Sequence, residues 1–522
     1  MSTALYSQQQ TLIQNLCSSE NNFPHSVKQL ERIETHISTV ILCGEFAYKI
    51  KKPVNFGFLD FTSLKQRHHF CKEELRLNRR LAPDLYLDVV ALRGSIDAPH
   101  FGSEGEIIEY AVKMRQFSQQ DLLDKQLAKG NLNGSQMDAL AADVQRFHQQ
   151  VAIADESSTL GTAEEVFAPM QQNFDQLYPL IKDPDAVAQL KRLEQWSQQH
   201  YQQLKPLLQE RKLKGFIREC HGDMHLGNMT LQDDKISLFD GIEFNESFRW
   251  IDVVSEIAFL IMDLDDRKAP KLARRFLNAY LEQSGDYQGL QLLRFYQVYR
   301  ALVRAKIASF RLAQEGLSDT EQQQAMAQYR SYTDLAETYT SAKKPHLCAT
   351  HGLSGSGKSH LSQQAVEQYG FIRLRSDLER KRLFGLETHQ NSNSSLNDDL
   401  YSSEATTKTY QRLQHLSELI LNSGFSPLID ATLLDPAQRA GFKQRAHDNG
   451  TAFVILDIHA DETLLKLRIK ARQEKGNDAS EADLQVLQQQ IKKYQTLQPD
   501  EADQIINIDN QEGYVLQLAF MD

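Results

Sequence analysis

A glycine-rich segment at residues 352–359, with the sequence GLSGSGKS, constrains the fold of this chain more than any other feature. It fits the pattern GxxxxGK[ST], in which glycines let successive main-chain N–H groups turn inward around phosphate oxygens. An apolar run at 346–350 precedes it and an amphipathic pattern at 360–369 follows it. We therefore predict a buried strand, a phosphate-binding loop and a helix, in that order.

The residue types within this segment predict how it binds a nucleotide. Gly352, Gly355 and Gly357 allow the main chain to approach the phosphates closely, at the positive end of the following helix. Lys358 is then expected to reach the terminal phosphates, and the Ser359 hydroxyl to ligate Mg²⁺. The segment thus predicts a site for ATP and Mg²⁺.

The C-terminal third alternates apolar runs with helical patterns. Such alternation predicts an α/β domain with a parallel sheet covered by helices on both faces. The expected strands are 346–350, 371–374, 426–429, 452–457 and 505–509.

Three polar residues follow two of these strands, at the sheet edge where ligands bind in such folds. Asp377 can accept the proton of an attacking hydroxyl group, and Arg380 can orient an anionic part of the substrate. An ordinary helix cap at Asp377 is the alternative. Asp430 ends the third strand, where a carboxylate can hold Mg²⁺ through water.

Two arginines on a later helix pattern have two interpretations. Arg468 and Arg472 are four residues apart and therefore share a helix face. They are expected to close over the nucleotide phosphates as a lid. The alternative is a solvated helix surface.

A second constellation lies in the N-terminal part, in the sequence CHGDMHLGN at 220–228. Asp223 can accept a hydroxyl proton while the amide oxygen of Asn228 ligates a metal ion. Twelve residues later, Asp240 follows an apolar run and is expected to be the second metal ligand. His221 and His225 are interpreted as supports of this loop and not as zinc ligands.

Length and composition limit the remaining possibilities. The chain has 522 residues, which is too long for one hydrophobic core, and a break near Pro345 predicts domains at 1–340 and 345–522. The net charge of −11 disfavours a large nucleic-acid-binding face. Five scattered cysteines fit reduced thiols, and neither a signal peptide nor a membrane span is expected, so we predict a cytoplasmic protein.

The two constellations resemble two known groups of kinases. The loop at 220–228 with Asp240 resembles the catalytic loop and metal-binding aspartate of aminoglycoside and choline phosphotransferases, which are relatives of protein kinases. The segment from about 346 to 510 resembles small P-loop kinases, including polynucleotide kinases, zeta toxins, chloramphenicol phosphotransferases and gluconate kinases. The whole chain resembles a bacterial two-domain family that joins an aminoglycoside-phosphotransferase-like domain to a predicted P-loop kinase.

This resemblance implies a bilobal α+β domain of the protein-kinase type followed by the α/β P-loop domain. It implies that Lys49 holds the nucleotide phosphates and that Glu74 is its ion-pair partner, with Lys51 and Glu73 as close competitors. It also implies that Asp377 is the general base of the second site. A GxGxxG pattern does not precede Lys49, a departure that favours small-molecule kinases over protein kinases.

The leading hypothesis is therefore a cytoplasmic enzyme with two ATP·Mg²⁺ sites, each transferring a γ-phosphate to a hydroxyl group of a small molecule. One alternative is that one domain only binds ATP and regulates the other through the 461–493 segment. Another is that the P-loop domain phosphorylates the 5′-hydroxyl of a nucleic acid, which predicts salt-sensitive oligonucleotide binding. The acceptor and the oligomeric state stay open at this point.

Overall fold

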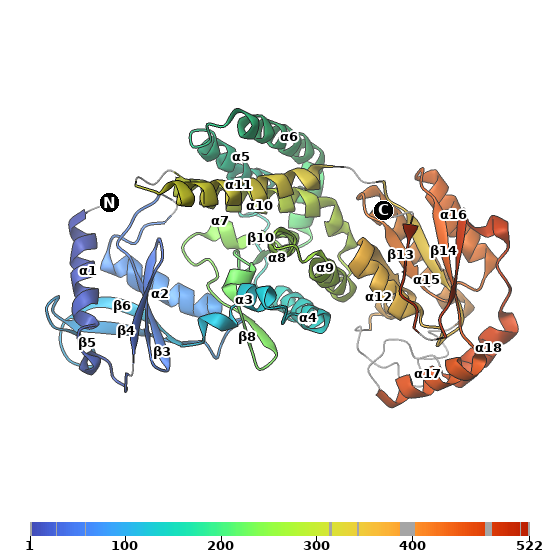
Figure 1. Cartoon of the computed structure of the whole chain (residues 1–522), viewed down its shortest axis with the longest axis horizontal. Helices are drawn as coiled ribbons and strands as arrows, with labels where there is room; N and C mark the ends of the chain where they lie inside the picture. The colour runs from blue at the N-terminus through green and yellow to red at the C-terminus, as the bar shows by residue number, and fades with distance from the viewer. Residues whose placement is uncertain are drawn as a thin grey trace. The chain divides into compact units, whose positions relative to one another are not determined.

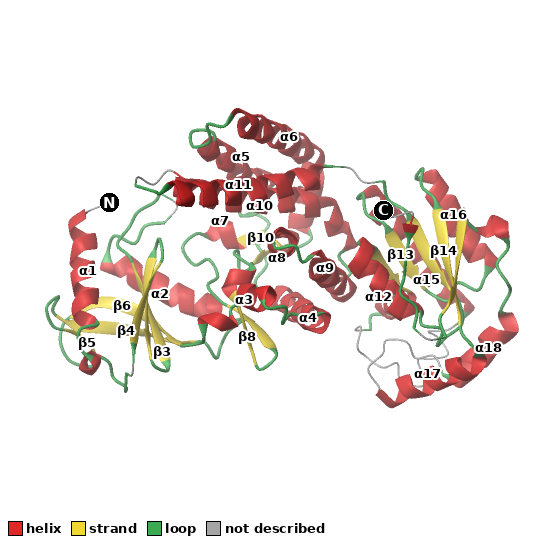
Figure 2. Cartoon of the chain, viewed as in Figure 1, coloured by secondary structure: helices red, strands yellow, loops and turns green. Residues whose placement is uncertain are grey.

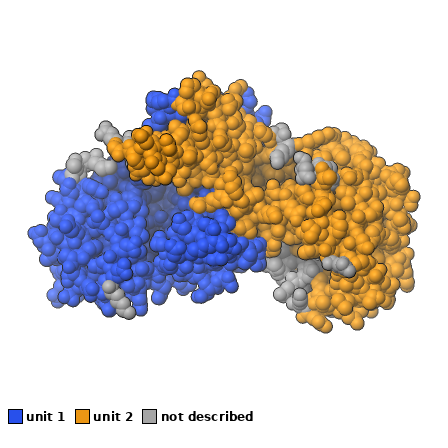
Figure 3. All heavy atoms as spheres, in the orientation of Figure 1, with its two compact units in different colours: residues 1–136, 146–182, 198–263 blue, residues 137–145, 183–197, 264–522 orange. Residues whose placement is uncertain are grey.

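The computed structural model describes residues 3–27, 29–57, 59–312, 316–341, 344–386, 402–475, 483–511 and 513–519. The chain divides into two compact units (Figure 3). Unit 1 comprises 1–136, 146–182 and 198–263, and unit 2 comprises 137–145, 183–197 and 264–522. This division groups residues by how they pack, and its units are not continuous in sequence. The predicted domain boundary between 340 and 345 therefore stays a prediction. Within that predicted linker, Ala342 and Lys343 lie outside the described residues.

Unit 1 begins with a six-stranded antiparallel sheet whose strand order is β1-β2-β3-β6-β4-β5 (Figure 1). The strands are β1 Leu30–Glu34, β2 Ser38–Cys43, β3 Phe46–Lys51, β4 Tyr86–Gly94, β5 Pro99–Phe101 and β6 Ile107–Arg115. Strands β2 and β3 form a hairpin about Cys43 and Gly44.

The two faces of this sheet pack against different helices. Tyr48 and Ile50 of β3 share a core with α1 (Thr3–Leu16), whereas Ala47 shares a core with Cys71 of α2 (Leu64–Asn78). Side chains alternate along a strand, so Lys49 and Lys51 lie on the α2 side with Ala47. The alternation therefore places both candidate lysines on the face that carries α2.

The remainder of unit 1 contains two small antiparallel sheets and helices (Figure 2). β7 (Ile217–Glu219) pairs with β10 (Trp250–Asp252), and β8 (Met229–Gln232) pairs with β9 (Lys235–Leu238). The helices after the first sheet are α3 Leu123–Ala128, α4 Gly134–Gln150, α5 Ala163–Leu177, α6 Pro184–Leu213, α7 Glu246–Arg249 and α8 Val253–Asp266, of which α4 and α6 belong partly to unit 2, through 137–145 and 183–197. The 220–228 loop joins β7 to β8.

Unit 2 contains a five-stranded parallel sheet of order β12-β13-β11-β14-β15. Its strands are β11 Leu347–His351, β12 Ile372–Arg375, β13 Pro427–Asp430, β14 Phe453–His459 and β15 Gln504–Asp509. The helices of this part are α12 Lys358–Tyr369, α13 Ser376–Leu383, α15 Ser403–Asn422, α16 Pro436–Asp448, α17 Glu462–Lys475 and α18 Leu484–Lys493. All five predicted strands, and the α/β class, are confirmed.

Besides parts of α4 and α6, unit 2 includes three whole helices that precede the sheet in sequence: α9 Pro270–Ser284, α10 Leu290–Leu312 and α11 Asp319–Thr340. Asn278 of α9 donates a hydrogen bond to the Phe371 carbonyl (2.9 Å) and accepts one from the Arg373 N–H (2.8 Å). The Arg373 guanidinium also pairs with Glu282 of α9 (2.7 Å). Helix α9 is therefore bonded to the main chain of β12, which is an end strand of the sheet.

None of the helices among the described residues combines the length and apolar composition needed to cross a membrane.

Candidate active sites

The first site is built on the 220–228 loop of unit 1, whose main chain is fixed by α8. Glu256 accepts hydrogen bonds from the N–H groups of His221 (2.7 Å) and Gly222 (2.9 Å). Gly222 has a φ of +87°, and a Cβ atom there would lie 2.6 Å from the Phe248 carbonyl oxygen. The tight turn before Asp223 therefore requires glycine.

Asp223 and Asn228 lie together, as their spacing predicts. The Asn228 amide nitrogen donates to the Asp223 carboxylate (2.8 Å) and to its main-chain oxygen (3.1 Å). The His225 imidazole lies 3.5 Å from the same carboxylate. Because the bonds to Asp223 use the amide nitrogen of Asn228, its amide oxygen is the atom suited to a metal ion.

Asp240 follows β9 in a left-handed conformation, with a φ of +63°. Its N–H group donates to the Tyr86 hydroxyl (3.0 Å), and the next N–H group, that of Gly241, donates to the Asn78 side chain (2.8 Å). The ring of His221 is hydrogen-bonded to the Phe239 carbonyl (2.9 Å). This last contact ties the 220–228 loop to the strand that precedes Asp240.

Both candidate lysines contact Glu74, one through each carboxylate oxygen. The ammonium group of Lys49 lies 2.8 Å from Glu74 and also contacts Asp240. Lys51 lies 2.6 Å from Glu74 and contacts Glu243. Of these five side chains only Asp240 is substantially exposed, at 43%. The geometry therefore places Lys49, and not Lys51, beside the predicted metal ligand.

The charges of this network shift the pKa of Glu74. Burial would raise that pKa, but the ammonium groups of Lys49 and Lys51 outweigh burial and lower it to about 2. Glu73, the competitor, instead pairs with Arg76 at 2.8 Å. Glu243 was missed by the sequence interpretation, and its position three residues after Asp240 is the only signal that could have suggested it.

The second site lies at the carboxyl ends of the parallel strands of unit 2. Gly352, Gly355 and Gly357 have φ values of +141°, +85° and +98°. A Cβ atom on Gly357 would collide with the Asn510 side chain. The Gly352 N–H group donates to the Thr432 carbonyl (3.2 Å), which joins the loop to the turn after β13.

Lys358 lies among the side chains predicted to share its site. Its ammonium group donates to the Leu353 carbonyl (2.8 Å). Burial lowers the pKa of Lys358 to about 8; the negative charges of Asp430 and Asp377 oppose this shift, and the positive charge of Arg472 adds to it. The structure thus brings together three predicted residues, Asp377, Asp430 and Arg472, around Lys358.

The remaining predicted residues of this site have specific contacts. Asp430 ends β13 and accepts a hydrogen bond from the Ser362 hydroxyl (3.0 Å). Asp377 lies in the first turn of α13. Arg380, one turn later on this helix, donates to the Thr406 hydroxyl of α15 (3.2 Å).

Arg468 of α17 binds the main chain of the glycine-rich loop. Its guanidinium donates to the carbonyl oxygens of Gly355 (3.3 Å), Ser356 (3.3 Å) and Asn510 (2.9 Å). In this structure Arg468 therefore braces the loop, and its predicted contact with phosphate stays a prediction. Arg472 lies one turn further along and acts electrostatically on Lys358.

The sequence interpretation also missed a buried group beside the loop. The Asp457 carboxylate is hydrogen-bonded to His351 (2.6 Å) and paired with His459 (2.8 Å). Burial would raise the pKa of Asp457, but these two imidazoles lower it overall. His351 and Asp457 lie on neighbouring strands, β11 and β14, and a polar residue at the end of an apolar strand was the available signal.

Comparisons with known proteins give one family model and one relative along the sequence. The sequence model described as AAA domain matches residues 347–497. Over 450 residues the chain is 30% identical to the uncharacterized protein Rv2004c of Mycobacterium tuberculosis, which covers 86% of this chain and 87% of that protein.

Two solved structures resemble separate parts of the chain. A complex of the amicoumacin kinase hAmiN with AMP-PNP, Ca²⁺ and Ami has a TM-score of 0.41 and 12% identity, covering 64% of this chain and 96% of the other. A gluconokinase from Sinorhizobium meliloti has a TM-score of 0.23 and 19% identity, covering 32% of this chain and 83% of the other.

Proposed function

The chain belongs to the family of the mycobacterial protein Rv2004c, and from this premise we propose that it is a phosphotransferase with two ATP·Mg²⁺ sites that transfer γ-phosphate to hydroxyl groups of small molecules. The observation that carries the proposal is common to both sites. In each, one lysine ammonium lies near a carboxylate that the chemistry needs as a metal ligand: Asp240 contacts Lys49, and the charge of Asp430 acts on Lys358.

In the first site, the side chains fit a magnesium nucleotide. The Asp240 carboxylate and the Asn228 amide oxygen are the hard oxygen ligands that Mg²⁺ prefers. Lys49, held by Glu74, would contact the phosphates. The apolar side chains of Ala47 and Val112 lie on the same face of the sheet and suit an adenine ring.

Asp223 is the proposed general base of this site. Its carboxylate is oriented by the Asn228 amide nitrogen, so a substrate hydroxyl could give its proton to the other oxygen. When bound, Mg²⁺·ATP supplies the phosphoryl group and offsets its developing negative charge. The residues of the chain orient the acceptor and accept its proton.

In the second site, the main-chain N–H groups of the 352–359 loop would hold the phosphates, together with Lys358 and Arg472. Ser359 and Asp430 are the proposed metal ligands. Asp377 is the proposed base: it lies in the first turn of α13, directly after β12, and its charge acts on Lys358. Arg380, in the next turn of α13, would contact the acceptor.

The test is a screen for ADP release with sugars, aminoglycosides, nucleosides and oligonucleotides as acceptors. An acceptor of the first site should lose turnover in Asp223→Asn, and an acceptor of the second site in Asp377→Asn. Each change removes a base without removing the lysine, so ATP binding should persist. Full turnover of every acceptor in both Asp223→Ala and Lys358→Ala variants would contradict the proposal.

A second candidate function is that the P-loop site senses ATP and regulates the first site. One observation favours it: the Arg373 guanidinium contacts both Glu282 of α9 and the Ser359 carbonyl (3.4 Å). Nucleotide at Ser359 could therefore affect a helix outside the parallel sheet. Turnover at the first site that changes in Lys358→Ala, which loses nucleotide at the P-loop, and not in Asp377→Asn, which keeps it, would favour this function over catalysis.

A further inference from the structure

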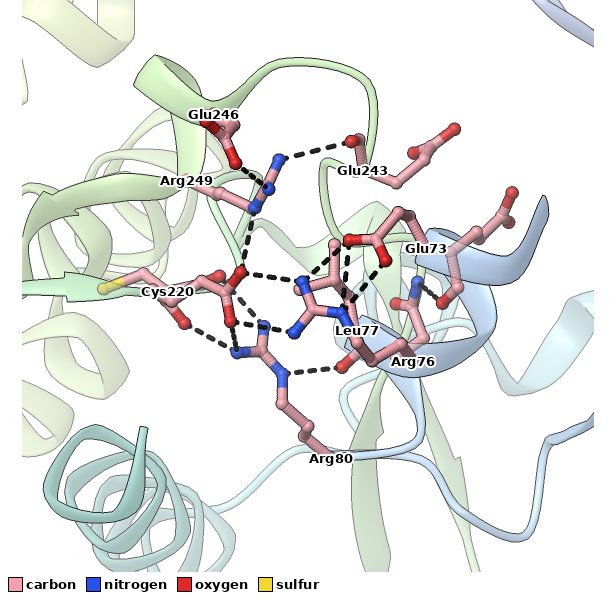
Figure 4. A network of polar contacts seen from close by, with 11 residues as sticks. Glu73, Arg76, Leu77, Arg80, Cys220, Glu243, Glu246 and Arg249 are labelled. Carbon is pink, nitrogen blue, oxygen red and sulfur yellow. Dashed lines mark hydrogen bonds and ion pairs between the residues drawn. The ribbon is translucent and has the colours of Figure 1, made fainter. Parts of the chain in front are cut away.

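Glu219 is a carboxylate that receives three arginine side chains and that the proposed chemistry does not use. It ends β7, four residues before Asp223 in the chain. Its oxygens lie 2.8 Å from Arg76, 3.1 Å from Arg80 and 3.2 Å from Arg249. Figure 4 shows these three arginines converging on one point.

Two of the three arginines come from the helix that carries Glu74. Arg76 lies in the last turn of α2, and Arg80 follows two residues after its end at Asn78. Arg80 also donates to the main-chain carbonyls of Glu219 (2.8 Å) and Cys220 (3.2 Å). The C-terminal end of α2 is therefore bonded directly to the main chain that leads into the catalytic loop.

The third arginine connects this cluster to the segment after Asp240. Arg249, at the end of α7, donates to the Glu243 carbonyl (3.2 Å) and pairs with Glu246 (3.1 Å). The Glu243 side chain contacts Lys51, which in turn contacts Glu74. These contacts link Glu219 to Glu74 by way of Arg249, Glu243 and Lys51. Helix α2 links Glu74 back to Arg76, which pairs with Glu219.

The arginines that are withdrawn from water need the negative charge of Glu219 as their partner. Its side chain is 9% exposed and that of Arg249 is 5% exposed, whereas that of Arg76 is 48% exposed. Guanidinium groups withdrawn from water require a paired anion. Burial alone would raise the pKa of Glu219, but the arginines lower it overall, so the carboxylate is ionised at neutral pH.

We propose that Glu219 is a positioning residue of the first site: through Arg76, Arg80 and Arg249 it fixes α2 relative to the catalytic loop. In this arrangement Glu74, two residues before Arg76, keeps Lys49 in register with Asp223 and Asp240. Alignment of the terminal phosphate then depends on a carboxylate that touches neither nucleotide nor acceptor. The inference rests on the proposed nucleotide site of unit 1.

The experiment compares the affinities of full-length variants for Mg·ATP and Mg·ADP by titration calorimetry, in a Lys358→Ala background that disables the P-loop site. The ratio of the two affinities reports on the terminal phosphate, whereas ADP affinity reports on the rest of the pocket. The test variants are Glu219→Gln and Arg76→Gln. The exposed Lys72 lies on the same helix, so Lys72→Gln is the matched loss of a positive charge.

Glu219→Gln should lower the preference for ATP over ADP by about tenfold, with ADP affinity changed by about twofold or less, because small misplacement of a phosphate ligand weakens that contact alone. Glu219→Asp, which keeps the charge, should recover part of the preference. Lys72→Gln should leave it unchanged. Arg76 is half exposed, so we expect Arg76→Gln to fold. This variant therefore decides the test if Glu219→Gln does not fold.

If folded Arg76→Gln and Glu219→Gln chains keep the parent's preference for ATP over ADP, the inference is overturned. The proposed function would stay intact. An equal loss of ADP and ATP affinity would also overturn it, since that result indicates general damage to the lobe. If the Lys358→Ala parent binds neither nucleotide, the proposed function of the first site fails, and the positioning role fails with it.

Discussion

Arg472 lies close enough to Lys358 for its positive charge to add to the burial that lowers the pKa of the lysine to about 8 from 10.5. The negative charges of Asp430 and Asp377 act on Lys358 in the opposite sense. Burial is the largest influence, and it makes the ammonium easier to deprotonate unless an anion such as phosphate binds at the glycine-rich loop.

Nucleotide binding at the P-loop site should therefore take up protons at alkaline pH. Because the pKa of Lys358 is lowered, its ammonium begins to lose its proton near pH 8, and an anion restores it. ATP affinity should fall as pH rises through about 8. Calorimetry in two buffers of different ionisation enthalpy, in a Lys49→Met background that removes the phosphate-contacting lysine of the first site, would count the protons. Lys358→Arg should abolish the uptake; undiminished uptake in that variant would assign it to another group.

Replacing the two arginines of α17 should have different effects. Arg472→Ala removes a charge near Lys358 and should slow phosphoryl transfer by about a hundredfold, the magnitude typical of one group that stabilises transition-state charge. Arg468→Ala removes hydrogen bonds to the loop carbonyls and should mainly weaken ATP binding. Steady-state kinetics would separate the two effects. Equal loss of turnover in both variants would contradict the distinction.

The two lysines of β3 should also differ. Lys49→Met should abolish turnover at the first site and change stability little, because Glu74 keeps Lys51 as a partner. Lys51→Met leaves the buried Glu243 without the ammonium group that it contacts, and should lower the free energy of unfolding by about 3–5 kcal/mol. Urea unfolding followed by circular dichroism would measure this. The exposed Lys65, replaced by Met, is the control, and a stable Lys51→Met chain would refute the assignment.

Asn278→Ala should destabilise the parallel sheet. The change leaves the Phe371 carbonyl and the Arg373 N–H group without their partner, and each unmet group costs about 1–3 kcal/mol. Asn278→Asp keeps the acceptor for Arg373 and loses the donor to Phe371, so it should be less harmful. Thermal unfolding of the full-length variants would rank them; equal midpoints for all three chains would contradict the expectation.

The sequence predicted the parts of the fold that depend on neighbouring residues. The five parallel strands are continuous apolar runs, and the 352–359 loop and the 220–228 loop are fixed by local spacing. Strand β1 (Leu30–Glu34) offers no such signal, because its alternation is weak: its side chains are exposed or half-buried, with no fully buried face.

The contacts that complete both sites could not be predicted, because they join distant positions. Glu219 lies 143 positions from Arg76, and Asn278 lies 95 positions from Arg373. For the same reason the sequence could not decide between Lys49 and Lys51. Both lie on one face of β3, and only the position of Asp240 separates them. Local pattern identifies candidate residues; tertiary contacts decide between them.

The pairing of Asn278 with β12 has a consequence for the behaviour of the protein in a crowded solution. An end strand offers unpaired main-chain groups to which a strand from another molecule can add, and this is a common route to aggregation. Asn278 occupies two of those groups from within the same chain, with a side chain that cannot propagate the ladder. Helix α9 therefore occupies two of the positions at which another strand could add, and loss of this one amide would leave both main-chain groups unpaired.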